Sequence, residues 1–261
     1  MARFILAAFS MLVLVYLLVP LVIIVGASLT TSEFLTFPPQ GLTLKWYERV
    51  LADRSYMAAF SISTWLALSA TVIALLLAVP ATLAIARFSF RGKGLVEAVL
   101  MSPLMMPYLV LGAALLQYGS AIGLMRSFPA LMVGHVVIIV PFIVRSVLPQ
   151  FSADQKALEE ASRDLGAGPF ATFFLVTLPQ IRGGAISGAI LAFITSWINV
   201  ELSIFNVTPA LTTIPVKLFN YIQYTVDPTI AAVSAITILV AAILLIIIDA
   251  VFGLDVIQTK K

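Results

Sequence analysis

Six long apolar stretches dominate this chain and leave it few ways to fold in water. Each is close to the roughly 20 apolar residues that an α-helix needs to cross a bilayer. Charged residues make up only 10% of the sequence, against about 25% in soluble domains, so polar groups are too few to coat a globule. We therefore predict an all-α membrane protein with six transmembrane helices in a single domain, 1–261. The stretches are 5–29, 61–86, 98–118, 130–148, 183–206 and 230–252.

Basic residues predict the orientation of these spans. If the amino terminus lies inside and the chain crosses six times, ten of the 15 lysines and arginines are cytoplasmic and five are outside. The positive-inside rule favours this arrangement, which puts both termini in the cytoplasm. The first stretch exceeds the roughly 7–15 apolar residues of a signal peptide and lacks a clear cleavage site, so we expect it to stay as a span. The inner ten are Arg3, Arg87, Arg91, Lys93, Arg145, Lys156, Arg163, Arg182, Lys260 and Lys261; the outer five are Lys45, Arg49, Arg54, Arg126 and Lys217.

The sequence excludes several function classes. It contains no cysteine, which rules out thiolate catalysis and cysteine-ligated metal sites. It contains no Gly-x-x-x-x-Gly-Lys-Ser/Thr phosphate loop, so we expect no enzyme activity and no cofactor bound by this chain. The net charge of +3 needs no nucleic-acid partner, because the basic residues lie where the topology requires them. Contact with membrane lipid is the alternative explanation of that charge.

Two shorter features accompany the spans. Residues 44–51, in the longest outer loop, predict a short amphipathic helix whose Trp46 and Tyr47 lie at the lipid headgroups. This helix is interpreted as an interfacial anchor, with contact to an extracytoplasmic partner as the alternative. Pro103 and Pro107 fall in the third stretch. Membrane helices tolerate proline, so we prefer a packing role for them over a bend beside a solute path.

The polar segment 150–182, between the fourth and fifth stretches, carries clear helix signals. Ser152 and the glutamine three residues later form a capping-box start, and Gly166 supplies a stop. Pro169 suits the first turn of a second helix, which is expected to end near Leu178. The segment is therefore predicted to be two short helices and not a flexible linker.

Small and acidic side chains share one face of the first of these helices. Ala157, Ala161 and Asp164 lie on it, with Glu160 beside them. Small residues let another backbone approach closely, while the like-charged pair at four-residue spacing costs a few tenths of a kcal/mol. Lys156 offsets part of this cost, and a basic groove on a partner would offset more. The local pattern leaves a solvated surface helix and a docking surface as alternatives.

The same segment contains a motif of fixed spacing. Its matching residues are Glu160, Ala161, Gly166, Val176, Leu178 and Pro179. In the membrane-spanning subunits of bacterial ABC importers the motif is Glu-Ala-Ala, three residues, Gly, nine residues, an aliphatic residue, any residue and Leu-Pro; Ser162 replaces the second alanine here. The chain resembles these permeases over nearly its whole length, most of all the second permease subunit of the spermidine/putrescine-type group.

This resemblance implies a division of labour. Two such permeases, identical or different, form the path in the bacterial inner membrane, and a binding protein delivers solute from outside. Two separate ATPase subunits bind ATP and Mg²⁺, and their closure drives alternating access. The coupling loop is 150–182, and the residues implied to contact the ATPase are Glu159, Glu160, Ala161, Ser162, Arg163, Asp164, Leu165 and Gly166.

The fifth stretch departs from the polyamine pattern of this group. Similar permeases often show Thr-Ser-Phe-Asp-Glu, whereas residues 195–201 read Thr-Ser-Trp-Ile-Asn-Val-Glu. The acidic pair is missing, and one carboxylate appears two residues later. The resemblance therefore implies a small, amine-containing solute that is either polyamine-like or amino-acid-like.

Glu201 is the acidic residue that lies well inside an apolar stretch, where a carboxylate is costly and by default functional. Trp197, Glu201 and Phe205 recur every four residues and would share a helix face that suits an amine, through charge pairing and cation–π contact. Asn199 would face elsewhere unless the helix unwinds. The alternative is that Glu201 reaches outer water or caps a neighbouring helix. Two further candidates for the solute path are Gln117 and Tyr118.

Other residues in the spans have simpler interpretations. The lone His135 is interpreted as a hydrogen-bonded packing residue and not as a metal ligand. Asp249 is expected to pair or reach the surface near the inner end of the last span, while Gly184 and Gly188 predict a close helix crossing. Two rival classes remain: a self-sufficient channel or secondary transporter, and an intramembrane enzyme. Both would need more polar residues than Glu201 and His135 supply.

Overall fold

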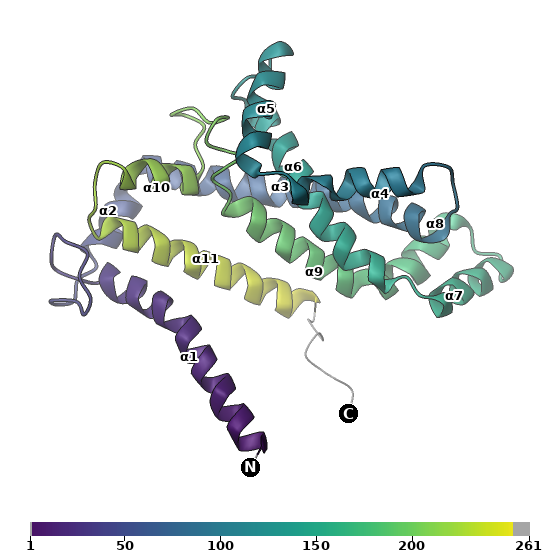
Figure 1. The fold of residues 1–261 in the computed structure, drawn as a ribbon, viewed down its shortest axis with the longest axis horizontal. Helices are drawn as coiled ribbons and strands as arrows, with labels where there is room; N and C mark the ends of the chain where they lie inside the picture. Colours follow the sequence, from purple (N-terminus) through teal and green to yellow (C-terminus); the bar gives the residue numbers. More distant parts are fainter. Residues whose placement is uncertain (1, 253–261) are drawn as a thin grey trace. The chain divides into compact units, whose positions relative to one another are not determined.

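The computed structural model describes residues 2–252, and this part of the chain consists of helices and their connections, with no strand within it (Figure 1). This confirms the all-α class. Residues 253–261, including Lys260 and Lys261, lie outside the described residues, as does the side chain of Asp249. The elements are α1 (Ala2–Ser28), α2 (Lys45–Ala52), α3 (Arg54–Arg87), α4 (Lys93–Met101), η1 (Ser102–Met105), α5 (Tyr108–Ala121), α6 (Phe128–Val147), η2 (Leu148–Gln150), α7 (Ala153–Asp164), α8 (Pro169–Thr172), η3 (Phe173–Thr177), α9 (Leu178–Trp197), α10 (Ile214–Ile222) and α11 (Thr229–Phe252).

Four helical stretches in the described chain are long and apolar enough to cross a membrane, or five if one bent pair is counted as a span. Five of the six predicted stretches have a helix at their centre, and the third is the bent pair. The described part of α11 that qualifies is a shorter apolar helix, Thr229–Leu244. The long, mainly apolar helices therefore agree with a multi-pass membrane protein. The straight-through paths predicted for the third and fifth spans need correction.

The third predicted span, 98–118, is not one helix. The stretches Lys93–Met105 and Tyr108–Ala121 meet at an angle of 107°. Met106 is extended, with φ −99° and ψ 137°, because the ring of a following proline disfavours the helical region for the preceding residue. A bend is therefore present where we expected the prolines to have only a packing role, and Pro107 is its local cause.

The fifth predicted span, 183–206, ends early. Helix α9 stops at Trp197, and residues 198–206 form turns. Asn199 contributes to this end, since its side-chain oxygen accepts a hydrogen bond of 2.9 Å from the Leu202 N–H; short polar side chains compete in this way with helical backbone bonds. The prediction that Trp197, Glu201 and Phe205 share a helix face is therefore wrong.

The chain divides into two compact units, Met1–Phe60 with Lys217–Leu244, and Ser61–Val216 with Leu245–Lys261. The single domain predicted over 1–261 stays a prediction. In the second unit α6 packs closely on α9, as the two glycines of α9 predicted. A Cβ on Gly184 would lie 2.5 Å from the Ser146 carbonyl oxygen, and one on Gly188 would lie 2.9 Å from the Cα of Ile143. Both positions therefore allow a backbone approach that a larger residue would block.

Candidate functional site

The polar segment 150–182, hereafter the elbow, begins with the helix that the sequence predicted. The Ser152 hydroxyl accepts a hydrogen bond from the Gln155 N–H, and the Gln155 side chain accepts one from the Ser152 N–H, each at 3.3 Å. This reciprocal pair is a complete capping box at the start of α7. At the other end Gly166 has a φ of +90°, a left-handed conformation that glycine adopts without steric cost. Both predicted ends of this helix are confirmed.

The second helix of the elbow starts as predicted but does not end where predicted. Pro169 opens α8, and a π-helical turn, η3, then carries the chain directly into α9. The whole stretch Pro169–Trp197 is helical. Pro179 is the second residue of α9. In an ordinary α-helix its ring would clash with the preceding turn, but the preceding turn here is the wider π-helical turn, which leaves room for the ring. The expected stop near Leu178 is therefore absent.

The elbow leaves large apolar side chains exposed to solvent. Leu165 is 90% exposed and Phe170 is 80% exposed, and Leu158 and Leu175 are also exposed. The acidic Glu160 is exposed beside them, and its carboxylate lies 3.7 Å from the Lys156 amine, as the four-residue spacing suggested. The exposed surface of the elbow thus carries apolar side chains together with both acidic and basic ones, the basic ones including Arg163.

Glu159 differs from the other predicted coupling residues because it points inward. Its side chain is 5% exposed, and its two oxygens accept hydrogen bonds of 2.9 and 3.2 Å from the Arg87 guanidinium. One of those oxygens also accepts a bond of 2.9 Å from the Thr177 hydroxyl. Glu159 is therefore enclosed and paired within its own chain, and its predicted contact with an ATPase stays a prediction. The pairing of Arg87 with Glu159 is not evident from the sequence, because no local pattern links residues 72 positions apart.

A second polar cluster surrounds the point where α9 ends. His135, on α6, is 1% exposed; its Nδ1 lies 2.8 Å from the Ser196 hydroxyl and its Nε2 lies 3.0 Å from the Ser203 hydroxyl. The Asn206 side-chain amide donates to the carbonyl oxygens of Gly112, at 2.9 Å, and Leu202, at 3.2 Å. His135 therefore joins the end of α9 to the turns that follow it, and Asn206 joins those turns to α5. The interpretation of His135 as a hydrogen-bonded packing residue is confirmed.

The turns 198–206 pass directly along α5. A Cβ on Gly112 would lie 2.7 Å from the Leu202 carbonyl oxygen and 3.0 Å from that of Glu201. Glu201 itself is exposed, Asn199 and Trp197 are buried, and Phe205 is half-buried. Glu201 is therefore the charged residue of this predicted group, and its side chain is exposed.

Gln117 and Tyr118 are exposed on α5 but do not converge with Glu201. At 3.6 residues per turn they lie about 140° and 120° around the helix from Gly112, the residue that packs on the backbone of Glu201. The structure therefore gives no geometric reason to place all of the predicted path residues at one site.

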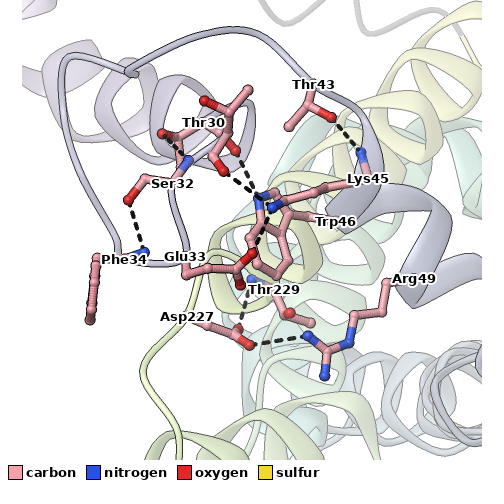
Figure 2. Close-up of polar contacts among 11 residues, drawn as sticks. Thr30, Ser32, Glu33, Phe34, Thr43, Lys45, Trp46, Arg49, Asp227 and Thr229 are labelled. Carbon is pink, nitrogen blue, oxygen red and sulfur yellow. Dashed lines mark hydrogen bonds and ion pairs between the residues drawn. The ribbon is translucent and has the colours of Figure 1, made fainter.

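Residues 30–49 and 227–229, hereafter the cap, lie in the first unit and include the segment predicted as an outer anchor (Figure 2). The helix α2 agrees with the prediction for residues 44–51. Trp46 is 2% exposed, and its indole N–H donates to the Thr30 carbonyl oxygen at 2.8 Å, so this ring packs against its own chain and the headgroup placement is wrong for it. Around it, Lys45 pairs with Glu33 at 2.8 Å and Arg49 with Asp227 at 3.4 Å.

The sequence profile of a family described as "Binding-protein-dependent transport system inner membrane component" matches residues 70–257. The chain belongs to this family. The matched region of this permease contains both the elbow and the broken end of α9. The family consists of membrane components of transport systems, so both candidate sites have to be understood in terms of transport.

Individual proteins are similar over most of this permease. It is 28% identical over 231 residues to the spermidine/putrescine transport system permease protein PotC of Escherichia coli (strain K12), covering 88% of this chain and 87% of PotC. It is 29% identical over 228 residues to the putrescine transport system permease protein PotI of the same organism, covering 85% and 81%. The molybdate/tungstate transport system permease protein WtpB of Pyrococcus abyssi (strain GE5 / Orsay) is 30% identical over 188 residues, covering 72% and 70%.

A solved structure shares the fold. It is the crystal structure of a bacterial ABC transporter involved in the import of the acidic polysaccharide alginate, with a TM-score of 0.73, 15% identity and 95% coverage of both chains. Together these findings confirm that the chain is a permease subunit of an ABC importer, a multi-pass inner-membrane transport component and not a catalytic enzyme. They decide against the channel, secondary-transporter and intramembrane-enzyme alternatives.

Proposed function

We propose that this permease forms, with a second permease subunit, the path for a small amine-bearing cation, and that its elbow receives motion from separate ATPase subunits. The observation that carries the proposal is the exposed surface of the elbow. Helix α7 is fixed by a capping box at its start and by Gly166 at its end, yet it holds Leu158 and Leu165 out in solvent. A fixed helix with exposed apolar side chains is suited to contact with another protein.

The proposal assigns ATP and Mg²⁺ to two partner ATPase subunits and solute capture to an extracytoplasmic binding protein. Seven of the predicted coupling residues, all except Glu159, belong to the contact surface in this scheme. The membrane topology is six spans with both termini in the cytoplasm, the bent pair α4–α5 counting as one span and α11 as the last. Four crossings then place the elbow on the cytoplasmic side. The α1 span is exposed along most of its length, with Ala27 and Ser28 buried at its end, and would face lipid or the second permease.

The solute is proposed from charge. The polyamine permeases PotC and PotI match this chain, but so does the molybdate/tungstate permease WtpB, so similarity alone favours neither cation nor oxyanion. Glu201 is exposed at the broken end of α9, and a carboxylate in a solute path attracts cations and repels oxyanions. A polyamine-like or amino-acid-like amine is therefore the better fit. Trp197, buried at the end of α9, supports this segment and does not form a cage with Glu201.

A cysteine-scanning experiment tests the elbow. Because the chain has no native cysteine, a single Leu165→Cys variant reports only on that position. We expect it to cross-link to an ATPase subunit in the assembled transporter and to resist a membrane-impermeant maleimide added outside intact cells. Tyr224→Cys is the matched control, since Tyr224 is 88% exposed and is expected outside. Labelling of Leu165→Cys from outside, or no cross-link to the ATPase, would contradict the proposal.

Uptake by transporters in lipid vesicles tests the solute class. We expect Glu201→Gln to lower uptake of radiolabelled putrescine by about tenfold, because one charge-assisted contact in a path is worth on the order of 1.4 kcal/mol. Glu97→Gln, a change of the same kind on α4, is the control and should leave uptake close to that of the parent. Equal putrescine uptake by Glu201→Gln and the parent, or efficient molybdate uptake by the parent, would refute the cation assignment.

A further inference from the structure

Arg87, the last residue of α3, lies at the centre of contacts with three parts of the elbow. Its guanidinium carbon lies 5.0 Å from the ring centre of Phe151, and one of its nitrogens donates to the Ser152 carbonyl oxygen at 3.2 Å. Its other nitrogens bind both oxygens of Glu159. The end of one span thus contacts the residues that begin α7 and the middle of α7.

Glu159 extends these contacts to the far end of the elbow. It accepts a hydrogen bond from Thr177, the last residue of the π-helical turn before α9. Arg87, Glu159 and Thr177 therefore connect α3, α7 and the start of α9 through three consecutive side chains. All of these residues belong to the same compact unit.

The pair is buried, unlike the other ion pair of the elbow. The side chains of Arg87 and Glu159 are 11% and 5% exposed, whereas those of Lys156 and Glu160 are about 60% exposed, at 60% and 59%. A planar guanidinium bound to both oxygens of a carboxylate fixes the relative orientation of the two groups as well as their distance. The adjacent glutamates 159 and 160 therefore have different surroundings, one enclosed and one in solvent.

We propose that Arg87 and Glu159 are positioning residues that clamp the elbow to the inner end of α3, so that the elbow, α3 and the start of α9 move as one body during transport. This rests on the proposed function, since it presumes that the elbow receives an external motion. Without the clamp, a push on the exposed surface of α7 would be absorbed by rotation of the elbow about its two connections. With the clamp, the push reaches two spans together.

Distance measurements between two spin labels test the clamp directly. Ser89→Cys, just after α3, and Asp154→Cys, in the first turn of α7, are both exposed, and the cysteine-free chain allows them to be labelled alone. In the assembled transporter in lipid nanodiscs we expect one narrow distance that is the same without nucleotide and with ATP and vanadate. In Arg87→Gln we expect that distance to broaden and to change with nucleotide.

Three further variants separate the clamp from a general loss of stability. Arg91→Gln removes an equal charge from the same loop, at an exposed residue, and should behave as the parent. The pair Arg87→Gln with Glu159→Gln leaves no lone buried charge and should fold, yet still show the broadened distance. The charge exchange Arg87→Glu with Glu159→Arg should restore a narrow distance at least in part, which a purely structural role for each residue would not produce.

The functional readout is coupling. We expect Arg87→Gln with Glu159→Gln to lower ATP-driven putrescine uptake by about tenfold, within the usual range of coupling free energies between two sites, while ATP hydrolysis by the complex continues. A label distance that changes with nucleotide in the parent, or one that stays narrow and constant in Arg87→Gln, would overturn the clamp. If the label distances behave as expected but Leu165→Cys contacts no ATPase, the proposed function fails and the clamp stands.

Discussion

The elbow and the cap both contain ion pairs, Arg87–Glu159 across 72 positions and Lys45–Glu33 across 12, and the surroundings of the pairs differ. In the elbow, Arg87 and Glu159 are nearly enclosed and meet through two hydrogen bonds. In the cap, the Lys45 and Glu33 side chains are 41% and 72% exposed and meet through one contact (Figure 2). Water and salt weaken exposed ion pairs far more than enclosed ones. We therefore expect the enclosed pair to hold α3 and α7 together more firmly than the exposed pair holds Lys45 and Glu33.

The largest expected effect comes from breaking the enclosed pair. Glu159→Ala leaves the Arg87 guanidinium buried without its carboxylate, which costs about 3–5 kcal/mol in folding free energy. Glu160→Ala, one residue along on the same helix but exposed, should change stability by less than about 1 kcal/mol. Denaturant unfolding of the purified permease, followed by circular dichroism, measures both. Equal destabilisation of the two variants would remove the distinction between enclosed and exposed pairs.

A buried neutral network tests whether enclosure matters without charge. His135→Ala removes hydrogen bonds to the Ser196 and Ser203 hydroxyls, both buried, and leaves two unpaired groups at about 1–3 kcal/mol each. The Ser196→Ala/Ser203→Ala/His135→Leu combination removes the polar groups together and should be less damaging than His135→Ala alone. The same unfolding measurement decides, and a more damaged triple variant would argue that packing outweighs polar pairing here.

The turn after α7 tests whether the clamp alone makes the elbow stiff. Gly166 has a φ of +90° and open space around it, so Gly166→Ala is opposed by backbone strain of about 1–2 kcal/mol and not by a clash. We expect uptake to fall while ATP hydrolysis persists, because the elbow must change its path to relieve the strain. Gly168→Ala is the control, since Gly168 has a φ of −69° and equal space. Normal uptake by Gly166→Ala would assign the stiffness to the clamp alone.

The smallest expected effect comes from the exposed Lys45–Glu33 pair of the cap. Glu33→Gln removes the exposed pair with Lys45 and should cost about 0.2–1 kcal/mol at low ionic strength, with the loss shrinking at high salt. Trp46→Ala removes a buried ring and its bond to Thr30 and should cost about 3–5 kcal/mol. Thermal unfolding at two salt concentrations compares them. A salt-independent loss in Glu33→Gln would show that the cap pair is more enclosed than its exposure indicates.

Local sequence patterns predicted the elements whose cause is local. The capping box at Ser152, the stop at Gly166 and the short helix around Trp46 are set by residues within one or two turns, and all three are present. The close crossing at Gly184 and Gly188 was also predictable, because small residues on one helix face permit such contact whatever lies opposite.

The two errors in the spans have a common reason. The stretches around Pro107 and Asn199 are apolar enough to read as continuous helices, so hydropathy alone does not report where they bend or stop. Beside the break after Trp197, His135 pairs with the Ser196 and Ser203 hydroxyls, and Asn206 donates to the carbonyl oxygens of Leu202 and Gly112. A backbone break within a span needs polar partners, and here Asn199 and Asn206 of the turns supply them to the Leu202 N–H and carbonyl.

The sequence by itself determined that this chain is helical, that it belongs in a membrane, and that a motif-bearing helix follows residue 152, since composition, periodicity and capping act over a few residues. Only the tertiary structure decided which of two neighbouring glutamates faces solvent, and that Glu159 meets Arg87 across 72 residues. The reason is physical: the gain from an enclosed ion pair depends on which groups the fold brings together and how well it excludes water from them.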